Sequence, residues 1–233
     1  MKGETKMKYL TFSYDDGVTQ DIRLVELFNK YGMKCTFNIN SGLLGKDGYL
    51  DINGVRVNHI KVKPEDVRYI YDGHEVAGHG LTHPCLARLT DEKIIEEVEV
   101  DRVRLSELCG YDVVGFAYPG GDYDRRVSQL IKNKTGIKYC RTVTSTHDFV
   151  PQDYLHEFNP TVYHHKEWDK LFELGDKFLS LKTDTPSVFY VWGHAYEFDI
   201  HNSWDRFEEF LKMMSKAKDI EFVTNKEALL DRR

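Results

Sequence analysis

Short apolar runs with strand character alternate with amphipathic helical stretches, and this alternation restricts the fold more than any other feature of the chain. Strands that alternate with helices pair in parallel through right-handed crossovers. About seven such units in a chain of this length favour a closed or nearly closed barrel over an open doubly wound sheet. The expected strands cover residues 9–14, 34–38, 74–78, 113–118, 138–143, 187–193 and 221–224. We therefore predict a single-domain α/β fold that is TIM-barrel-like.

Capping residues indicate where the crossover helices begin and end. Thr19, Thr90 and Ser203 are the expected N-caps of three helices, because their hydroxyls accept hydrogen bonds from free N–H groups of a first turn. Gly32 and Gly110 are expected to end the first two of these helices. The three helices are predicted to pack on the outside of the sheet.

Two stretches depart from the alternation. Residues 49–62 contain Asn53-Gly54, a pair that suits a two-residue hairpin turn, so we predict a hairpin outside the main sheet. Residues 144–168 show no clear periodicity and are predicted to be irregular. Neither stretch divides the chain into domains.

Charge and hydropathy exclude several classes of partner. The net charge is −6 with both signs mixed along the chain, so no nucleic-acid partner is expected. No apolar run reaches the roughly 18 residues of a membrane span, and the first residues hold no apolar signal-peptide core. We predict a cytoplasmic protein, unless a leader has been removed, with residues 1–7 as an N-terminal extension. The four separated cysteines predict reduced thiols rather than disulfides or a thiolate metal site; oligomeric state is not readable.

Unusual polar residues follow the predicted strands at the point where each ends. In a parallel barrel these ends share one face, which carries the active site. The residues concerned are Asp15-Asp16-Gly17, His79 and His83, Pro119-Gly120-Gly121-Asp122, Arg141 and His194. We therefore expect five separate loops to bring an Asp pair, three histidines and a glycine turn to one rim.

The Asp pair and the first two histidines are typical of a metal site. Adjacent carboxylates project in different directions, so one can bind a metal while the other acts as a base. His79 and His83 are spaced i and i+4 and would share a face if their loop entered a helical turn, a chelating geometry for zinc. Each element alone has a simpler explanation, since Asp-Asp-Gly suits a turn and the histidines suit structural positions. One carboxylate and two imidazoles together form an open three-ligand set.

The last two elements suit the rest of a hydrolytic site. The glycines after Pro119 let a ligand approach main-chain N–H groups, as in an oxyanion site, although a plain turn fits them equally. His194 follows an apolar strand, where a satisfied buried histidine is common. Placed opposite a metal-activated water, His194 becomes a candidate general acid.

These motifs, in this order, resemble those of the polysaccharide deacetylase family, also called the chitooligosaccharide deacetylase homology domain or carbohydrate esterase family 4. The resemblance covers residues 8 to 225 or so. The family's TFDDG motif appears as TFSYDDG at 11–17, with two residues inserted or with the strand read as SYDDG. Its His-Ser/Thr-x-x-His motif appears as HGLTH at 79–83, with Gly80 where the hydroxyl residue usually stands. Its Leu-x-His motif appears within VWGH at 191–194.

The resemblance implies a distorted (β/α)7 barrel, with residues 8–233 forming the catalytic domain. It also implies a divalent metal, with zinc expected and cobalt, nickel or manganese able to use the same ligands. Tyr118, within the third motif, is a candidate substrate contact. The implied roles are general base for Asp15, metal ligands for Asp16, His79 and His83, general acid for His194, and oxyanion donor for the Gly120 N–H.

Two departures from the family pattern bear on the substrate. The third motif usually begins with an Arg that orients the base, and here Ala117 stands there. We hypothesise that Arg141, on the next strand, reaches the same place. The fourth motif, Asp-x-x-Asp-Trp, has no match, and His147-Asp148-Phe149 is the nearest segment. The hydrolytic residues are present, so these departures indicate a subgroup distinct from typical chitin or peptidoglycan deacetylases.

The resulting hypothesis is a metal-dependent hydrolase that removes N-acetyl groups from an amino-sugar oligo- or polysaccharide. Three alternatives stay open from the sequence. One is hydrolysis of a non-sugar amide or cyclic ureide on the same fold, and another is a non-catalytic carbohydrate-binding relative. In the third, the histidines are structural and no metal binds.

Overall fold

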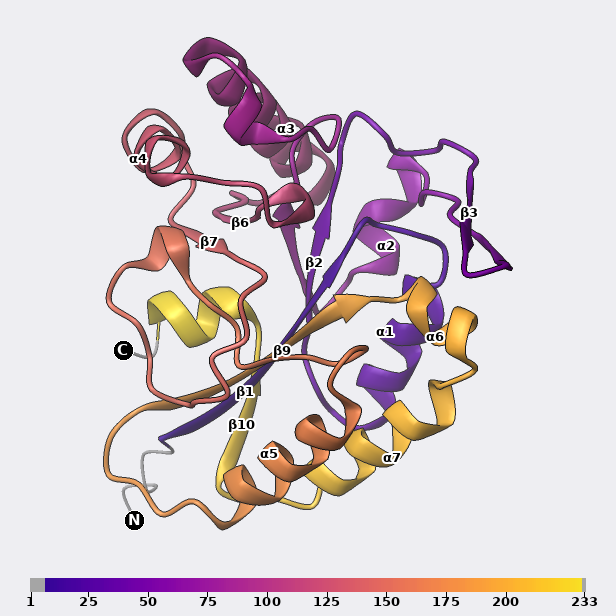
Figure 1. Ribbon diagram of the computed structural model, residues 1–233, viewed down its shortest axis with the longest axis vertical. Helices are drawn as coiled ribbons and strands as arrows, with labels where there is room; N and C mark the ends of the chain where they lie inside the picture. Colours follow the sequence, from indigo (N-terminus) through magenta and orange to yellow (C-terminus); the bar gives the residue numbers. More distant parts are fainter. Residues whose placement is uncertain (1–6, 232–233) are drawn as a thin grey trace.

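A parallel sheet runs through the computed structural model, which describes residues 7–231 (Figure 1). Its hydrogen-bonded order is β7-β6-β5-β2-β1-β9-β8, and β10 pairs in parallel with the first half of β1. The eight strands are β1 (Lys8–Asp15), β2 (Thr36–Ile39), β5 (Glu75–Gly78), β6 (Gly115–Ala117), β7 (Tyr139–Arg141), β8 (Val162–Tyr163), β9 (Ser187–His194) and β10 (Ile220–Val223). The curled, mostly parallel arrangement confirms the predicted α/β barrel fold.

Helices cover the outside of the sheet. α5 and α7 lie together along one side of β1 and β9, while α3 packs beside β5 and against α4 (Figure 1). The α-helices are α1 (Asp21–Lys30), α2 (Val67–Ile70), α3 (Asp91–Cys109), α4 (Arg125–Lys134), α5 (Trp168–Ser180), α6 (Tyr196–His201) and α7 (Trp204–Met214). Shorter turns are η1 (Pro64–Asp66), η2 (Leu86–Arg88), η3 (Pro119–Gly121), η4 (Leu155–Glu157) and η5 (Glu227–Asp231). No helix among residues 7–231 has the length and apolar character needed to cross a bilayer.

The predicted capping residues behave differently from one another. Thr90 accepts a hydrogen bond from the Lys93 N–H and begins α3, and Gly110 ends it with a left-handed φ of 77°, as expected. α1 begins at Asp21 rather than directly after Thr19, and its N-cap is Gln20. Ser203 precedes α7 without a side-chain capping bond, so its position was predicted but its capping role was not observed.

The hairpin prediction is correct and the prediction for residues 144–168 is wrong in part. β3 (Tyr49–Ile52) and β4 (Val55–Asn58) pair antiparallel around Asn53-Gly54, outside the main sheet and against α6 (Figure 1). Within the stretch expected to be irregular, the two-residue strand β8 pairs with β9. A strand this short carries too little periodicity to be seen in a sequence.

The core and the termini complete the description. The interior is largely aromatic and aliphatic, with the rings of Phe12, Phe28 and Phe207 packed together on the helix side of β1. All four cysteines are free, as expected, although Cys85 is exposed. The predicted extension, residues 1–7, lies outside the described residues except for Met7. The assignment of residues 8–233 as one catalytic domain stays a prediction.

Candidate functional site

Asp15 ends β1 and has partners on three other strands, of which β2 and β9 are its neighbours. The parallel register places it beside Asn38 on β2 and His194 on β9. Asn38 Nδ2 donates to Asp15 Oδ1 over 2.8 Å, and Arg141 on β7 donates to Oδ2 in a buried ion pair. Nε2 of His194 lies 4.0 Å from the same Oδ2. With only 2% of Asp15 exposed, its carboxylate is fixed in one orientation at the rim.

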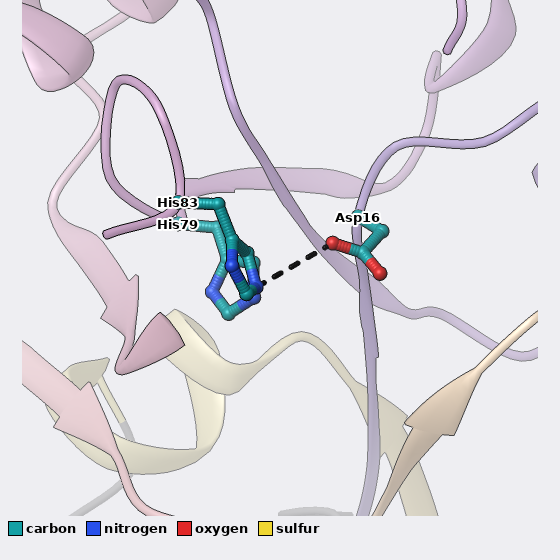
Figure 2. Close-up of side chains that lie close together, drawn as sticks. All are labelled: Asp16, His79 and His83. Atoms are coloured by element: carbon teal, nitrogen blue, oxygen red, sulfur yellow. Dashed lines mark ion pairs between the residues drawn. The ribbon is translucent and has the colours of Figure 1, made fainter. Parts of the chain in front are cut away.

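Asp16, His79 and His83 form a cluster beside Asp15. One potential ligand atom from each lies within 4.8 Å of the others. Figure 2 shows both imidazoles directed toward the Asp16 carboxylate, and Oδ1 of Asp16 is 3.8 Å from Nε2 of His83. A carboxylate and two imidazoles form a donor set that suits zinc and similar divalent ions and leaves coordination positions open. The residues present therefore fit a metal ion of this kind.

His79 presents the correct nitrogen to the cluster. Its Nδ1 lies 2.8 Å from the Ala117 carbonyl oxygen, which can only accept, so Nδ1 carries the proton and Nε2 keeps its lone pair. The His79 N–H donates to Ile39 O over 3.0 Å and to Asp101 Oδ2 over 3.1 Å. Burial lowers the pKa of His79 to about 4, which keeps the ring in the neutral form that metal binding requires.

The loop that joins His79 to His83 is irregular, so the helical turn considered for this spacing is absent. His83 instead reaches the cluster through a left-handed backbone, with φ 59°, after a left-handed Gly80 with φ 75°. Asn40 Nδ2 holds the loop by donating to the carbonyls of His79 over 2.6 Å and Gly80 over 2.8 Å. The two imidazole rings lie edge to face, with centroids 4.8 Å apart.

Asp16 has its own set of partners, which the sequence did not indicate. Oδ2 of Asp16 lies 3.2 Å from Nε2 of His59, and the Lys61 ammonium lies 3.4 Å from Oδ1 and 2.6 Å from the Asp16 carbonyl oxygen. Burial alone would raise the pKa of Asp16, but the His59 hydrogen bond and the Lys61 charge hold it well below its usual range. Asp16 is therefore ionised and suited to a cation.

His194 is paired with Glu197, three residues later on α6. Nδ1 of His194 lies 3.2 Å from Glu197 Oε1, and the His194 N–H donates to Oε2 over 3.0 Å. The Tyr163 hydroxyl donates to Oε1. Burial alone would lower the pKa of His194, but Glu197, Asp16 and Asp15 together raise it to about 9. At neutral pH the pair is an imidazolium and a carboxylate.

Gly193 makes the tight packing before His194 possible. A Cβ at this position would overlap the ring of His164, which is fully buried behind the strand. Nε2 of His164 in turn lies 3.8 Å from Oε2 of Glu197. The glycine in the VWGH segment therefore lets a second histidine approach the carboxylate that faces His194.

A cleft of about 490 Å³ opens over Asp15 and His194. Trp192 and Tyr163 stack with ring centroids 4.2 Å apart and form one wall. Gly120, with φ 59°, lines the cleft, and open space surrounds the position of a Cβ there. The Tyr118 hydroxyl donates to the His156 carbonyl, so Tyr118 lines the cleft without offering its hydroxyl. The remaining lining residues are Val143, Ser145, Lys166 and Glu167.

All eight residues singled out from the sequence lie on this rim or behind it. Those that the sequence missed are Glu197, Tyr163, His59 and Lys61. A glutamate at i+3 from His194 was the one visible signal, because a short helix after a strand brings i and i+3 together. No sequence pattern links His59 or Tyr163 to the site, since each depends on a long-range packing of the chain.

The fold and the cluster at the carboxyl ends of its strands define the class of protein. The chain belongs to the polysaccharide deacetylase family, whose family profile matches residues 2–140. This match covers the strand ends with Asp15, Asp16, His79, His83 and Gly120.

Three relatives illustrate the similarity. The uncharacterized protein YlxY of Bacillus subtilis (strain 168) is 24% identical over 112 residues, which are 48% of this chain and 30% of that protein. The chain thus spans about 30% of the length of this curated relative. A Mycobacterium smegmatis protein assigned to the polysaccharide deacetylases has a TM-score of 0.72 at 14% identity, covering 100% of this chain and 92% of that one. A family 4 acetyl xylan esterase from Clostridium thermocellum, in complex with a cobalt ion, has a TM-score of 0.59 at 14% identity, covering 95% and 90%.

Proposed function

We propose that this chain is a divalent-metal-dependent N-deacetylase that removes acetyl groups from an N-acetylated amino-sugar carbohydrate. The observation that carries the proposal is the position of the cluster Asp16, His79 and His83 directly beside Asp15 and His194, which line the cleft. Family membership supports deacetylase chemistry. Zinc is the expected ion, and cobalt, nickel or manganese would fit the same ligands.

Asp16, His79 and His83 would hold the ion. When bound, a divalent cation there would polarise the amide carbonyl and lower the pKa of a water molecule beside it. His79 offers Nε2 because Nδ1 is committed to the Ala117 carbonyl. Asp16 faces both imidazoles (Figure 2), and its Oδ1 lies 3.8 Å from Nε2 of His83.

Asp15 is the proposed base. Its Oδ2 lies 3.9 Å from Nε2 of His79 and 4.0 Å from Nε2 of His194, so it faces the space between the ligand cluster and the acid. Arg141 and Asn38 fix the two oxygens in this orientation. In the proposed reaction Asp15 accepts a proton from water as the water oxygen bonds to the acetyl carbon.

His194 is the proposed acid. Its imidazolium donates a proton to the amide nitrogen as the C–N bond breaks, so the products are acetate and a free amine. Glu197 acts as a positioning residue, because it contacts Nδ1 and leaves Nε2 directed at the cleft. The Gly120 N–H is proposed to donate to the oxyanion that forms during the attack.

Acetate release tests this proposal directly. The purified chain would be assayed with N-acetylated oligosaccharides of several lengths, with an O-acetylated xylan, and with small non-sugar amides and a cyclic ureide. Parallel samples would contain a chelator, followed by zinc or cobalt addition. The proposal predicts release from N-acetyl sugars that the chelator stops and the metal restores. Turnover of the amides or the ureide alone, or no turnover with carbohydrate binding retained, would support the alternatives.

A further inference from the structure

We propose that His59, delivered by the segment that returns from the β3–β4 hairpin, is a positioning residue that turns one oxygen of Asp16 toward the metal. The inference deepens the proposed function and rests on it. It rests on the observation that the two carboxylate oxygens of Asp16 have different partners, His59 at Oδ2 and His83 at Oδ1. The hairpin thereby gains a role in the site, although it lies outside the main sheet.

The two oxygens of Asp16 face different neighbours. Oδ1 faces the histidine cluster, 3.8 Å from Nε2 of His83, and the Lys61 ammonium lies 3.4 Å from this same oxygen. Oδ2 lies 3.2 Å from Nε2 of His59. An ionised carboxylate can only accept, so His59 Nε2 is the nitrogen that carries the proton. With Oδ2 occupied, Oδ1 is the oxygen that Asp16 can offer to a metal ion.

Residues 59–62 are tied to the loop that carries Asp16. Val62 N donates to Gly17 O over 2.9 Å, and Thr19 N donates to Ile60 O over 2.8 Å. Lys61 forms an antiparallel bridge with Val18, and its buried ammonium donates to the Asp16 carbonyl. These contacts fix the position of the His59 backbone relative to Asp16.

The backbone of Asp16 needs such support. Its φ is 86°, in the left-handed region that is strained for a residue with a Cβ. The Asp16 N–H donates to Asn38 O over 2.9 Å, and Lys61 holds the carbonyl. These two bonds fix the main chain but leave the side-chain torsions free. Within the carboxylate, His59 holds Oδ2 at 3.2 Å, while the Lys61 ammonium lies 3.4 Å from Oδ1.

His59 is itself held in place. Its ring packs edge-on against Tyr196 of α6, with centroids 5.2 Å apart. Its N–H donates to Gly48 O over 2.9 Å, which extends the hairpin ladder by one residue. A partner that fixes a ligand in this way typically raises metal affinity by about 10–100-fold. We therefore expect the loss of His59 to weaken metal binding and leave the fold intact.

The experiment compares zinc dissociation constants of wild type, His59→Ala and His59→Gln. Each apo protein would compete with a chromophoric zinc chelator at one fixed pH. We expect His59→Ala to bind zinc about 10–100-fold more weakly. His59→Gln keeps an N–H donor at similar reach and should recover most of the affinity. The matched control is His201→Ala, which removes an exposed imidazole of α6 outside this cluster.

Cobalt spectra separate positioning from ligation. If His59 positions Asp16, the visible Co²⁺ bands of saturated His59→Ala match those of wild type, because the ligands are the same. Shifted bands would place His59 on the metal and overturn the positioning role. An affinity of His59→Ala within twofold of wild type would also overturn it. If wild type binds no zinc at all, the proposed function fails together with the inference. Melting curves of the apo proteins confirm that each variant is folded.

Discussion

The guanidinium of Arg141 and the carboxylate of Asp15 form a buried ion pair across the sheet, although their strands, β7 and β1, are not neighbours. Only 1% of Arg141 and 2% of Asp15 is exposed. The guanidinium also lies over the Trp192 ring, 4.4 Å from its centroid. Ala117 stands where the family's third motif usually has an Arg that orients the base. Arg141, on the following strand, contacts the Asp15 carboxylate instead.

Replacing Arg141 with Met should lower both stability and activity. A buried carboxylate that loses its partner destabilises a fold by about 3–5 kcal/mol, so the free energy of unfolding from urea titration should fall by that order. The exposed pair of Arg126 and Asp91 provides the control, because Arg126→Met should cost about 0–1 kcal/mol. Equal stabilities of the two variants would contradict the importance of the buried pair.

Replacing His79 with Ala should remove the metal. His79 is a proposed direct ligand, so its loss should weaken zinc binding by more than the about 10–100-fold expected for an outer-shell residue. Elemental analysis after dialysis against a weak chelator should find about one ion per wild-type chain and almost none in the variant. Retention of stoichiometric zinc by His79→Ala would place the metal elsewhere.

Replacing His194 with Asn should lower kcat and spare metal binding. Loss of a general acid typically costs about 10²–10⁴-fold in rate. Acetate release under saturating substrate measures kcat, and the zinc content of the same sample serves as the internal control. A variant with near-normal kcat would exclude His194 as the proton donor.

Replacing Glu197 with Gln should change the pH dependence of kcat/KM. A general acid works in its protonated form, so the rate falls as pH rises through the pKa of His194, which is about 9. Removing the Glu197 charge should lower this pKa by about 1–3 units and shift the alkaline limb toward neutral pH.

The control for this pH profile is Glu167→Gln. Glu167 also lines the cleft, but its carboxylate is held by Ser145 and His147 rather than by His194. We expect the alkaline limb of the Glu167→Gln pH profile to stay at the wild-type pH. A Glu197→Gln pH profile that coincides with that of wild type would show that Glu197 does not raise the pKa of His194.

The position of the Asp16, His79 and His83 cluster could be predicted from the sequence because strand ends are visible in it. Asp15 and Asp16 end or follow one apolar run, and His79 follows another, so the parallel fold alone brings them to one rim. The backbone conformation that brings these side chains together could not be predicted in the same way. Asp16 and His83 have left-handed backbones. Lys61 donates to the Asp16 carbonyl, and Asn40 donates to the carbonyls of His79 and Gly80 in the loop before His83; both donors lie far from these residues in the chain.

The supporting residues could not be predicted for the same reason. His59 reaches Asp16 because a hairpin folds back against the first loop, and no periodicity encodes that contact. Tyr163 lies on a strand of two residues, too short to give a pattern. Arg141 was the exception, because its place on the strand after the third motif suggested that it could replace the missing Arg.

Tyr196 lies between the two halves of the site, against the His59 ring on one side and, with centroids 5.0 Å apart, against the His194 ring on the other. A change in the size or tilt of this single ring would disturb both histidines at once, so under the proposed function metal affinity and proton donation would change together. Substitutions on the outer cleft wall, at Val143 or Lys166, would leave both of these ring contacts intact.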